Sequence, residues 1–202
     1  MTTINPVGNG LTGITGSGNF VGATSPTIAT PTISGAISVA TAATSNSLVI
    51  STSNGYVTTP NHPAFLATSS GHSNVTGDGT TYQCVYETAA TNISSSYNTS
   101  TGLFTAPVAG MYLFTAAIDS SGIVLATNTS TRGSFNKNNG TLYYFQLELA
   151  SPQVSSGELI FNGSIVVPMA LNDTMAVDFY VAGGTKVVSF GTSGYFSGVL
   201  VG

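Results

Sequence analysis

The sequence predicts an all-β protein built as a β-sandwich, and two observations support this. Only 5% of the 202 residues are charged, so helix formers such as Glu, Lys and Arg are scarce, whereas β-branched and aromatic residues are common. Several segments also alternate apolar and polar residues with a period of two, and Gly, Asn and Ser turns separate them. Because the hydrophobic fraction is 42%, we expect a buried core rather than wholesale disorder.

Residues 1–59 form a distinct compositional zone at the start of the chain. The first Asp, Glu, Lys or Arg is Asp78, and Gly, Ser, Thr and Pro interrupt residues 7–36 every few positions. No stripe with a helical period runs through this stretch, so a helix is not expected. Two interpretations remain: a flexible linker, or an extended stem that becomes ordered by pairing with other chains, which the recurring apolar residues favour.

Strand signals begin at residues 47–51 and 55–58 and become dense after the prolines at 60 and 63. We therefore divide the chain into a segment of residues 1–59 and a head of residues 60–202. In the run at residues 82–86, the lone cysteine, Cys84, is expected to be a small buried apolar residue.

Four later segments show the period of two clearly. Residues 159–171 place apolar side chains, from Leu159 to Leu171, at nearly every odd position, with Gly163 as the only break. The same alternation predicts strands at residues 112–118, 143–149 and 175–181, and a turn at Asn172 and Asp173. Asp178 falls on the opposite face from its apolar neighbours in the last of these strands.

Residues 97–114, with the sequence YNTSTGLFTAPVAGMYLF, resemble the central signature of C1q/TNF-like domains. In that signature a Tyr precedes Thr-Gly-x-Phe-x-x-Pro-x-x-Gly-x-Tyr-x-Phe. The matching residues are Phe104, Pro107, Gly110, Tyr112 and Phe114. Physically, Gly102 and Gly110 suit the turns between strands, and Pro107 stiffens the connection without needing a ladder hydrogen bond.

Three further segments match the same family in order. Residues 63–67 are similar to its opening strand, the turn at Asn172 and Asp173 to its late Gly-Asp turn, and residues 195–201, with Phe196 and Gly198, to its closing strand. Asn accepts the left-handed conformation better than most residues, so Asn172 fits the turn. The resemblance implies a homotrimeric C1q/TNF-like jelly roll over residues 60–202, preceded by the extended N-terminal segment.

The first part of the chain shows a second resemblance. Residues 16–21, GSGNFV, and residues 25–33, SPTIATPTI, look like short units found in structural proteins of tailed bacteriophages, especially fibres. Neither a Gly-X-Y collagen repeat nor the pattern of a signal peptide accompanies them, so we expect a phage rather than a secreted animal setting.

Catalytic and metal chemistry are not expected. His62 and His72, the only imidazoles, are expected in exposed loops, and no nucleophile, base and orienting group are visible together. We expect no cofactor and no metal; the family resemblance leaves calcium at Asp119 or Asp78 as the alternative. Three Lys and Arg residues in a chain of net charge −4 cannot form a nucleic-acid or anionic-membrane surface.

Recognition of a partner is easier to place. The polar segment from residue 119 to residue 140 contains two of the three cations, Arg132 and Lys137, together with Phe135. We interpret it either as a solvated connection or as a loop in which these three side chains contact a host glycan or protein.

Three functions follow from these patterns, in decreasing order of preference. The first is a trimeric tail fibre on the exterior of the virion, attached to other virion proteins through residues 1–59 and contacting the host with its head. The second is a capsid decoration or head fibre without a specific receptor. The third is a polysaccharide depolymerase.

Overall fold

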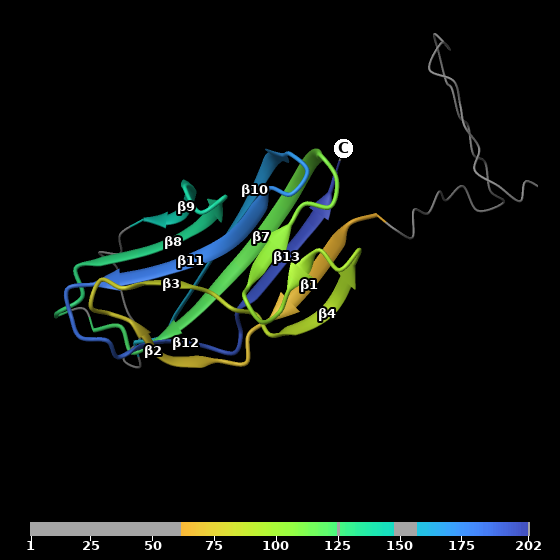
Figure 1. Ribbon diagram of the computed structural model, residues 1–202. Helices are drawn as coiled ribbons and strands as arrows, with labels where there is room; N and C mark the ends of the chain where they lie inside the picture. Colours follow the sequence, from red (N-terminus) through yellow and green to blue (C-terminus); the bar gives the residue numbers. More distant parts are fainter. Residues whose placement is uncertain (1–61, 125, 148–156, 202) are drawn as a thin grey trace, which may run out of the picture. The chain divides into compact units, whose positions relative to one another are not determined.

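The computed structural model describes residues 62–124, 126–147 and 157–201, and these residues contain strands and turns but no helix (Figure 1). Their thirteen strands are β1 (Ala64–Thr68), β2 (His72–Thr76), β3 (Thr81–Gln83), β4 (Thr88–Ile93), β5 (Tyr97–Asn98), β6 (Leu103–Thr105), β7 (Gly110–Ser121), β8 (Ser130–Lys137), β9 (Thr141–Leu147), β10 (Leu159–Met169), β11 (Thr174–Ala182), β12 (Val188–Phe190) and β13 (Tyr195–Leu200). The all-β prediction is confirmed. The strands predicted at residues 47–51 and 55–58 and the segment 1–59 lie outside the described residues, and the boundary at residue 60 stays a prediction.

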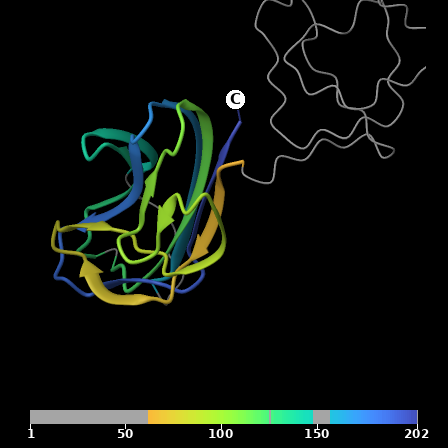
Figure 2. The ribbon, with the colours of Figure 1, turned by 45° about the vertical axis from the view of Figure 1, so that its right-hand side comes forward.

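The strands form two sheets that pack face to face, as the two views in Figures 1 and 2 show. One sheet has seven strands in the order β2-β12-β7-β13-β1-β4, and β10 pairs with β7. The other has six strands in the order β5-β6-β11-β8-β9, and β3 pairs with β11. All of these pairings are antiparallel, and strands distant in sequence lie side by side, as in a jelly roll.

The predicted signature residues meet in the core between the sheets. Phe104, Tyr112, Phe114 and Phe196 are each at most 1% exposed. The ring centroids of Phe104 and Phe114 lie 5.1 Å apart, and those of Phe114 and Phe196 lie 5.9 Å apart. Aromatic pairs at such separations add to the stabilisation that burial provides. Pro107 lies between β6 and β7, and Gly110 begins β7, as expected for the turn between these strands.

Two backbone positions show why the signature requires small or permissive residues. Gly102 has a φ of +73°, and a Cβ there would lie 2.3 Å from the carbonyl oxygen of Cys84. Asn172 has a φ of +68°, the left-handed conformation that its position in the predicted turn implied. Cys84 itself is fully buried, so the prediction of a small core residue is confirmed.

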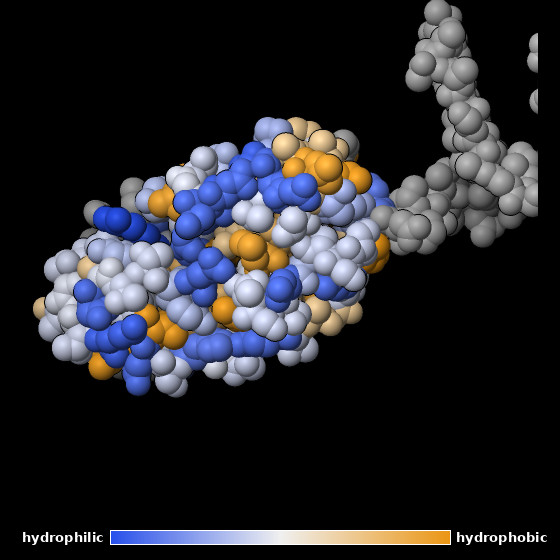
Figure 3. Space-filling view, in the orientation of Figure 1, coloured by the Kyte–Doolittle hydropathy of each residue, from blue (hydrophilic) through white to orange (hydrophobic). Residues whose placement is uncertain are grey.

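The alternation in the four long segments is largely confirmed within the described residues, with one correction at residue 171, whereas residues 148–149 of the predicted strand 143–149 lie outside them. β7, β10 and β11 place Tyr112, Phe161 and Val177 in the core, as predicted. Leu171 instead lies in the turn after β10 and is 59% exposed, because β10 ends at Met169. Val108, in the neighbouring β6–β7 connection, is also exposed, and Figure 3 shows a hydrophobic cluster at this end of the sandwich.

The beginning and the end of the described chain lie together. The Leu200 N–H donates to the Pro63 carbonyl at 3.0 Å, and the His62 ring contacts the Leu200 carbonyl. His62 is therefore half-buried, and the prediction of an exposed loop residue is wrong for it.

Candidate functional site

Half of the polar segment at residues 119–140, which was predicted as a loop, is strand, so that prediction is wrong for Arg132, Phe135 and Lys137. β7 continues to Ser121, and β8 occupies residues 130–137. Successive side chains of β8 point to opposite faces of the sheet. Phe135 therefore points into the core, where it is 1% exposed, and cannot contact a host, whereas Arg132 points outward.

Lys137 is also not a free cation. At the end of β8, its ammonium nitrogen Nζ lies 2.9 Å from Asp173 Oδ2 and donates to the Pro168 carbonyl at 2.7 Å. Asp173 in turn accepts bonds from the Ala170 N–H and the Asn138 side chain, each at 2.9 Å. The backbone bond from Ala170 and the bonds from Asn138 and Lys137 lower the pKa of Asp173 to about 2. This cluster fixes the β10–β11 turn rather than presenting charge to a partner.

The outward residues of β8 belong to rows that cross the six-stranded sheet. In the register of β8 with β11, Arg132 pairs with Tyr180 and Ser134 pairs with Asp178. Across the other neighbours, Ser134 pairs with Tyr144 of β9, and Tyr180 pairs with Thr81 of β3. Cross-strand partners on one face are close enough to interact, so side chains from four strands meet on this face.

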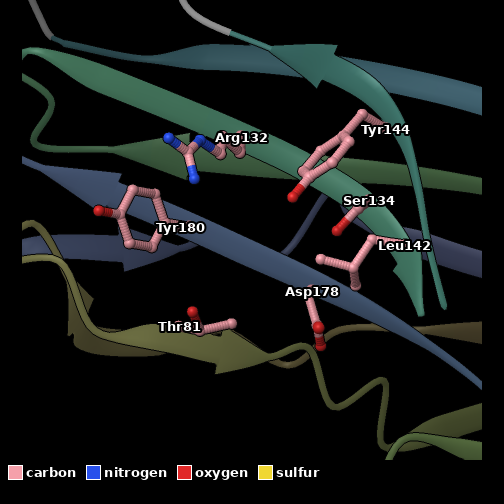
Figure 4. A pocket seen from close by; sticks show the side chains of 7 residues that line it. All are labelled: Thr81, Arg132, Ser134, Leu142, Tyr144, Asp178 and Tyr180. Atoms are coloured by element: carbon pink, nitrogen blue, oxygen red, sulfur yellow. The ribbon is translucent and has the colours of Figure 1, made fainter. Parts of the chain in front are cut away.

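These side chains surround a hollow of about 130 Å³ on the outer face of the six-stranded sheet, which we call the outer hollow (Figure 4). Its lining consists of Thr81, Arg132, Ser134, Leu142, Tyr144, Asp178 and Tyr180. The Arg132 guanidinium carbon lies 4.9 Å from the centroid of the Tyr180 ring, a cation–π contact that fixes the arginine above the sheet. Leu142 and Tyr144 are 40% and 48% exposed and form the opposite wall.

A second hollow of about 220 Å³ lies on the same sheet, lined by Gln83, Leu103, Asn136, Asn139, Thr174 and Ala176. Asn136 connects the two hollows, because its Nδ2 donates to Asp178 Oδ2 at 2.7 Å. Both residues are buried, with 9% and 8% exposure. The second hollow is lined only by uncharged residues.

Several polar groups in this region are held away from water. Burial raises the pKa of the Asp178 carboxyl above its ordinary value, and the bond from Asn136 offsets part of the rise. Arg132 Nε and Asn136 Oδ1 are buried and have no hydrogen-bond partner among the described residues. Buried polar groups in proteins nearly always have partners, so these two atoms are suited to bind something that the chain itself does not supply.

The described residues contain no cluster typical of a metal centre. No three His, Cys, Asp or Glu side chains within them lie close enough to hold a metal ion. Asp119 accepts from the Ser193 N–H and Asp78 from the Thr80 N–H, each at 3.0 Å. Asp178 is the only carboxylate among the residues that line the two hollows, so these hollows lack the carboxylate pair of a glycosidase.

His72 was expected in an exposed loop and instead begins β2, where its ring is partly buried. It contacts the Glu87 carboxylate and stacks on Phe190, with ring centroids 6.3 Å apart. Its contacts are therefore structural. The part of the chain described by the structure also contains no helix of the length and hydrophobicity needed to cross a bilayer.

Of the predicted contact residues, then, only Arg132 lies in the outer hollow. Sequence reasoning missed Tyr144, Tyr180 and Asn136, and it noted Asp178 only as a strand carboxylate. A signal was present in residues 131–136, where Thr131, Gly133 and Phe135 alternate with Arg132, Ser134 and Asn136. Reading this stretch with a period of two separates the core-facing set from the outward set.

The two packed sheets and the aromatic core define a jelly-roll sandwich, and the comparisons assign it to a family. The model of the C1q domain matches residues 64–201, so the chain belongs to the C1q domain family. The predicted family is thereby confirmed. A search of curated proteins finds no matching sequence.

Among solved structures, the chain is similar to the globular domain of zebrafish complement 1qA protein, with 18% identity and a TM-score of 0.49 over 70% of this chain and 98% of that one. It is also similar to murine APRIL, with 8% identity and a TM-score of 0.48 over 69% and 99% of the two chains. For Eiger TNF from S. frugiperda, the identity is 12% and the TM-score 0.48 over 70% and 94%.

Proposed function

We propose that this chain is a trimeric structural protein on the exterior of a tailed bacteriophage, a fibre whose C1q-like head contacts the host. The observation that supports the phage setting is the uncharged sequence before Asp78, with its fibre-like units at residues 16–21 and 25–33. In this proposal residues 1–59 attach the protein to other virion proteins, and the head faces outward.

The outer face of the seven-stranded sheet supports assembly of the head with copies of itself. Two rows cross this face: Val199, Leu113 and Val166 on β13, β7 and β10, and beside them Ser197, Thr115 and Ser164. None of these residues is charged, and Val166 is 52% exposed. Uncharged rows with exposed aliphatic side chains are typical of an interface that becomes buried on association. We assign it to the contact between protomers of a homotrimer.

The outer face of the six-stranded sheet is then free for recognition. It contains the two hollows and the aromatic and charged side chains of Arg132, Tyr144 and Asp178. A hollowed surface with a few placed polar groups is the usual form of a ligand site. The head can therefore use one sheet for assembly and the other for contact with the host.

Two measurements on the phage that encodes this chain test the proposal. Gold-labelled antibody against the protein, viewed by electron microscopy, should decorate the tail, and purified full-length protein should reduce adsorption of the phage to its host. Label on the capsid without an effect on adsorption would replace the fibre with a decoration protein. If the antibody labels no part of the particle, the virion proposal fails.

A further inference from the structure

We propose that the outer hollow and the adjoining second hollow form a binding site for a neutral oligosaccharide. The proposal builds on the host-contact function, because it names the chemical class that the head would recognise. It depends on the charge balance of the surface, on its unpartnered polar atoms, on its apolar wall and on the continuity of the two hollows.

The charge balance favours an uncharged ligand. Arg132 and Asp178 are the only charged residues that line the two hollows, and their charges are opposite. The nearby Lys137 is already paired with Asp173 at 2.9 Å. An anionic polymer would therefore be attracted by Arg132 but repelled by Asp178. A cationic ligand would be attracted by Asp178 but repelled by Arg132. A neutral ligand with many hydroxyl groups avoids both conflicts.

The polar atoms are arranged for groups that both donate and accept. Arg132 Nε is a buried donor and Asn136 Oδ1 a buried acceptor, and neither has a partner in the described part of the chain. The Asp178 carboxylate accepts one bond, from Asn136, and keeps capacity for others. A hydroxyl group can accept from the guanidinium and donate to the carboxylate or amide oxygen, so adjacent sugar hydroxyls would satisfy all of these atoms.

The wall of the outer hollow supplies the apolar contact that a sugar ring also needs. Tyr144 and Leu142 stand on β9 beside Ser134, and both remain substantially exposed. The C–H face of a pyranose is apolar and can lie against an aromatic ring, while its hydroxyls point to the polar groups opposite. Figure 4 shows Tyr144 and Leu142 on one side of the hollow and Arg132, Tyr180 and Thr81 on the other.

The two hollows together indicate a ligand of more than one sugar. Each exceeds by far the roughly 10–15 Å³ that a single water requires. They adjoin through the Asn136–Asp178 hydrogen bond and are both lined by residues of β3, β8 and β11. We therefore expect one sugar beside Tyr144 and the next toward Gln83 and Thr174.

Saturation-transfer NMR on the full-length protein tests this inference. The probes are di- to tetrasaccharides of glucose, galactose, rhamnose and N-acetylhexosamines, with uronic-acid oligosaccharides as the anionic comparison, all at millimolar concentration. We expect neutral probes to bind, and Asp178→Asn and Tyr144→Ala to weaken that binding at least tenfold. Asp119→Asn is the matched control, because it removes a carboxylate of β7, in the sheet that does not line the hollows, and its binding should equal that of the unmodified protein.

Three outcomes would overturn the proposal. They are no binding of any neutral probe, binding by Asp178→Asn and Tyr144→Ala that equals binding by the unmodified protein, or tighter binding of the anionic probes than of the neutral ones. Circular dichroism of each variant separates loss of binding from loss of fold. Saccharide binding needs neither host nor phage, so it can persist if the virion function fails. Conversely, if Asp178→Asn protein still blocks adsorption fully, the host function stands and the hollow is not its contact site.

Discussion

Two carboxylates of this protein have opposite environments, which shift their pKa values in opposite directions. Asp173 accepts three hydrogen bonds at a turn, which stabilise its charged form and lower its pKa to about 2. Asp178 lies against the outer hollow, where burial raises its pKa. The first carboxylate therefore stabilises the native turn, whereas the second costs stability in its charged form, which is typical of a group retained for binding.

Asp173→Asn should remove a pH-dependent part of the stability. Because the folded pKa of about 2 is below the ordinary 3.8, this carboxylate contributes its full stabilisation above pH 3.8 and loses it as the pH falls through 2. At neutral pH the variant should therefore unfold at a lower temperature than the unmodified protein. This difference in melting temperature should shrink as the pH falls from 3.8 to 2. A difference that is constant down to pH 2 would contradict the assignment.

At the scale of elements, one side chain fills the space where the two sheets meet. Within the described residues, β9 pairs only with β8, and β10 pairs only with β7. The Phe145 side chain of β9 packs against Gly163 and Phe161 of β10. Its ring centroid is 5.1 Å from that of Phe135. A Cβ at Gly163 would lie 2.2 Å from Phe145 Cβ, and one at Gly133 would lie 2.7 Å from its Cε2. Two glycines thus make room for one aromatic ring.

Gly163→Ala should destabilise the protein by about 1–3 kcal/mol, because the added methyl overpacks against Phe145. Urea unfolding at a fixed protein concentration measures this change. In the Phe145→Gly background, which removes the Cβ as well as the ring, the same substitution should cost less, by at least about 0.5 kcal/mol. Gly140→Ala is the control: the nearest atom to its Cβ is 3.7 Å away, so its effect should be small. Equal costs in both backgrounds would exclude the packing explanation.

The strands also differ in how far the sequence alone predicts them. β7 and β10 were predictable because large apolar residues recur at every second position along most of each strand, although apolar residues such as Leu113 and Val166 also occupy some intervening positions. β8 was not, since Phe135 is its only large apolar side chain and the rest of the segment has the composition of a loop. Its partners β9 and β11 decide its conformation, an example of tertiary context prevailing over local propensity.

The candidate site was predictable for one residue only. Arg132 was singled out as a rare cation, but Tyr144 and Tyr180 join it through the register of three strands. The sequence contains no local signal for that register. Similarly, the pairing of Lys137 with Asp173 depends on the packing of the predicted β10–β11 turn beside the end of β8, which residue spacing along the chain does not determine.

For the whole molecule, the two outer faces of the sandwich differ in a way that suits a trimer. The seven-stranded sheet presents uncharged rows around Leu113, and the six-stranded sheet presents the hollows. A protein with only 5% charged residues gains little from long-range electrostatic attraction, so the proposed trimer would depend on buried apolar area. The position of the exposed aliphatic side chains is therefore decisive for its oligomeric state.

Val166→Lys should convert the trimer into monomers without unfolding the sandwich. Val166 is 52% exposed on β10 and pairs with Leu113 in the centre of the proposed interface, whereas Val187, at 49%, lies in a loop. An uncompensated buried charge costs on the order of 3–5 kcal/mol, and a threefold interface would bury three of them. Sedimentation velocity should thus find a trimer for the unmodified protein and for Val187→Lys, and a monomer with unchanged circular dichroism for Val166→Lys. A trimeric Val166→Lys protein would move the interface to another face, and a monomeric unmodified protein would refute the trimer itself.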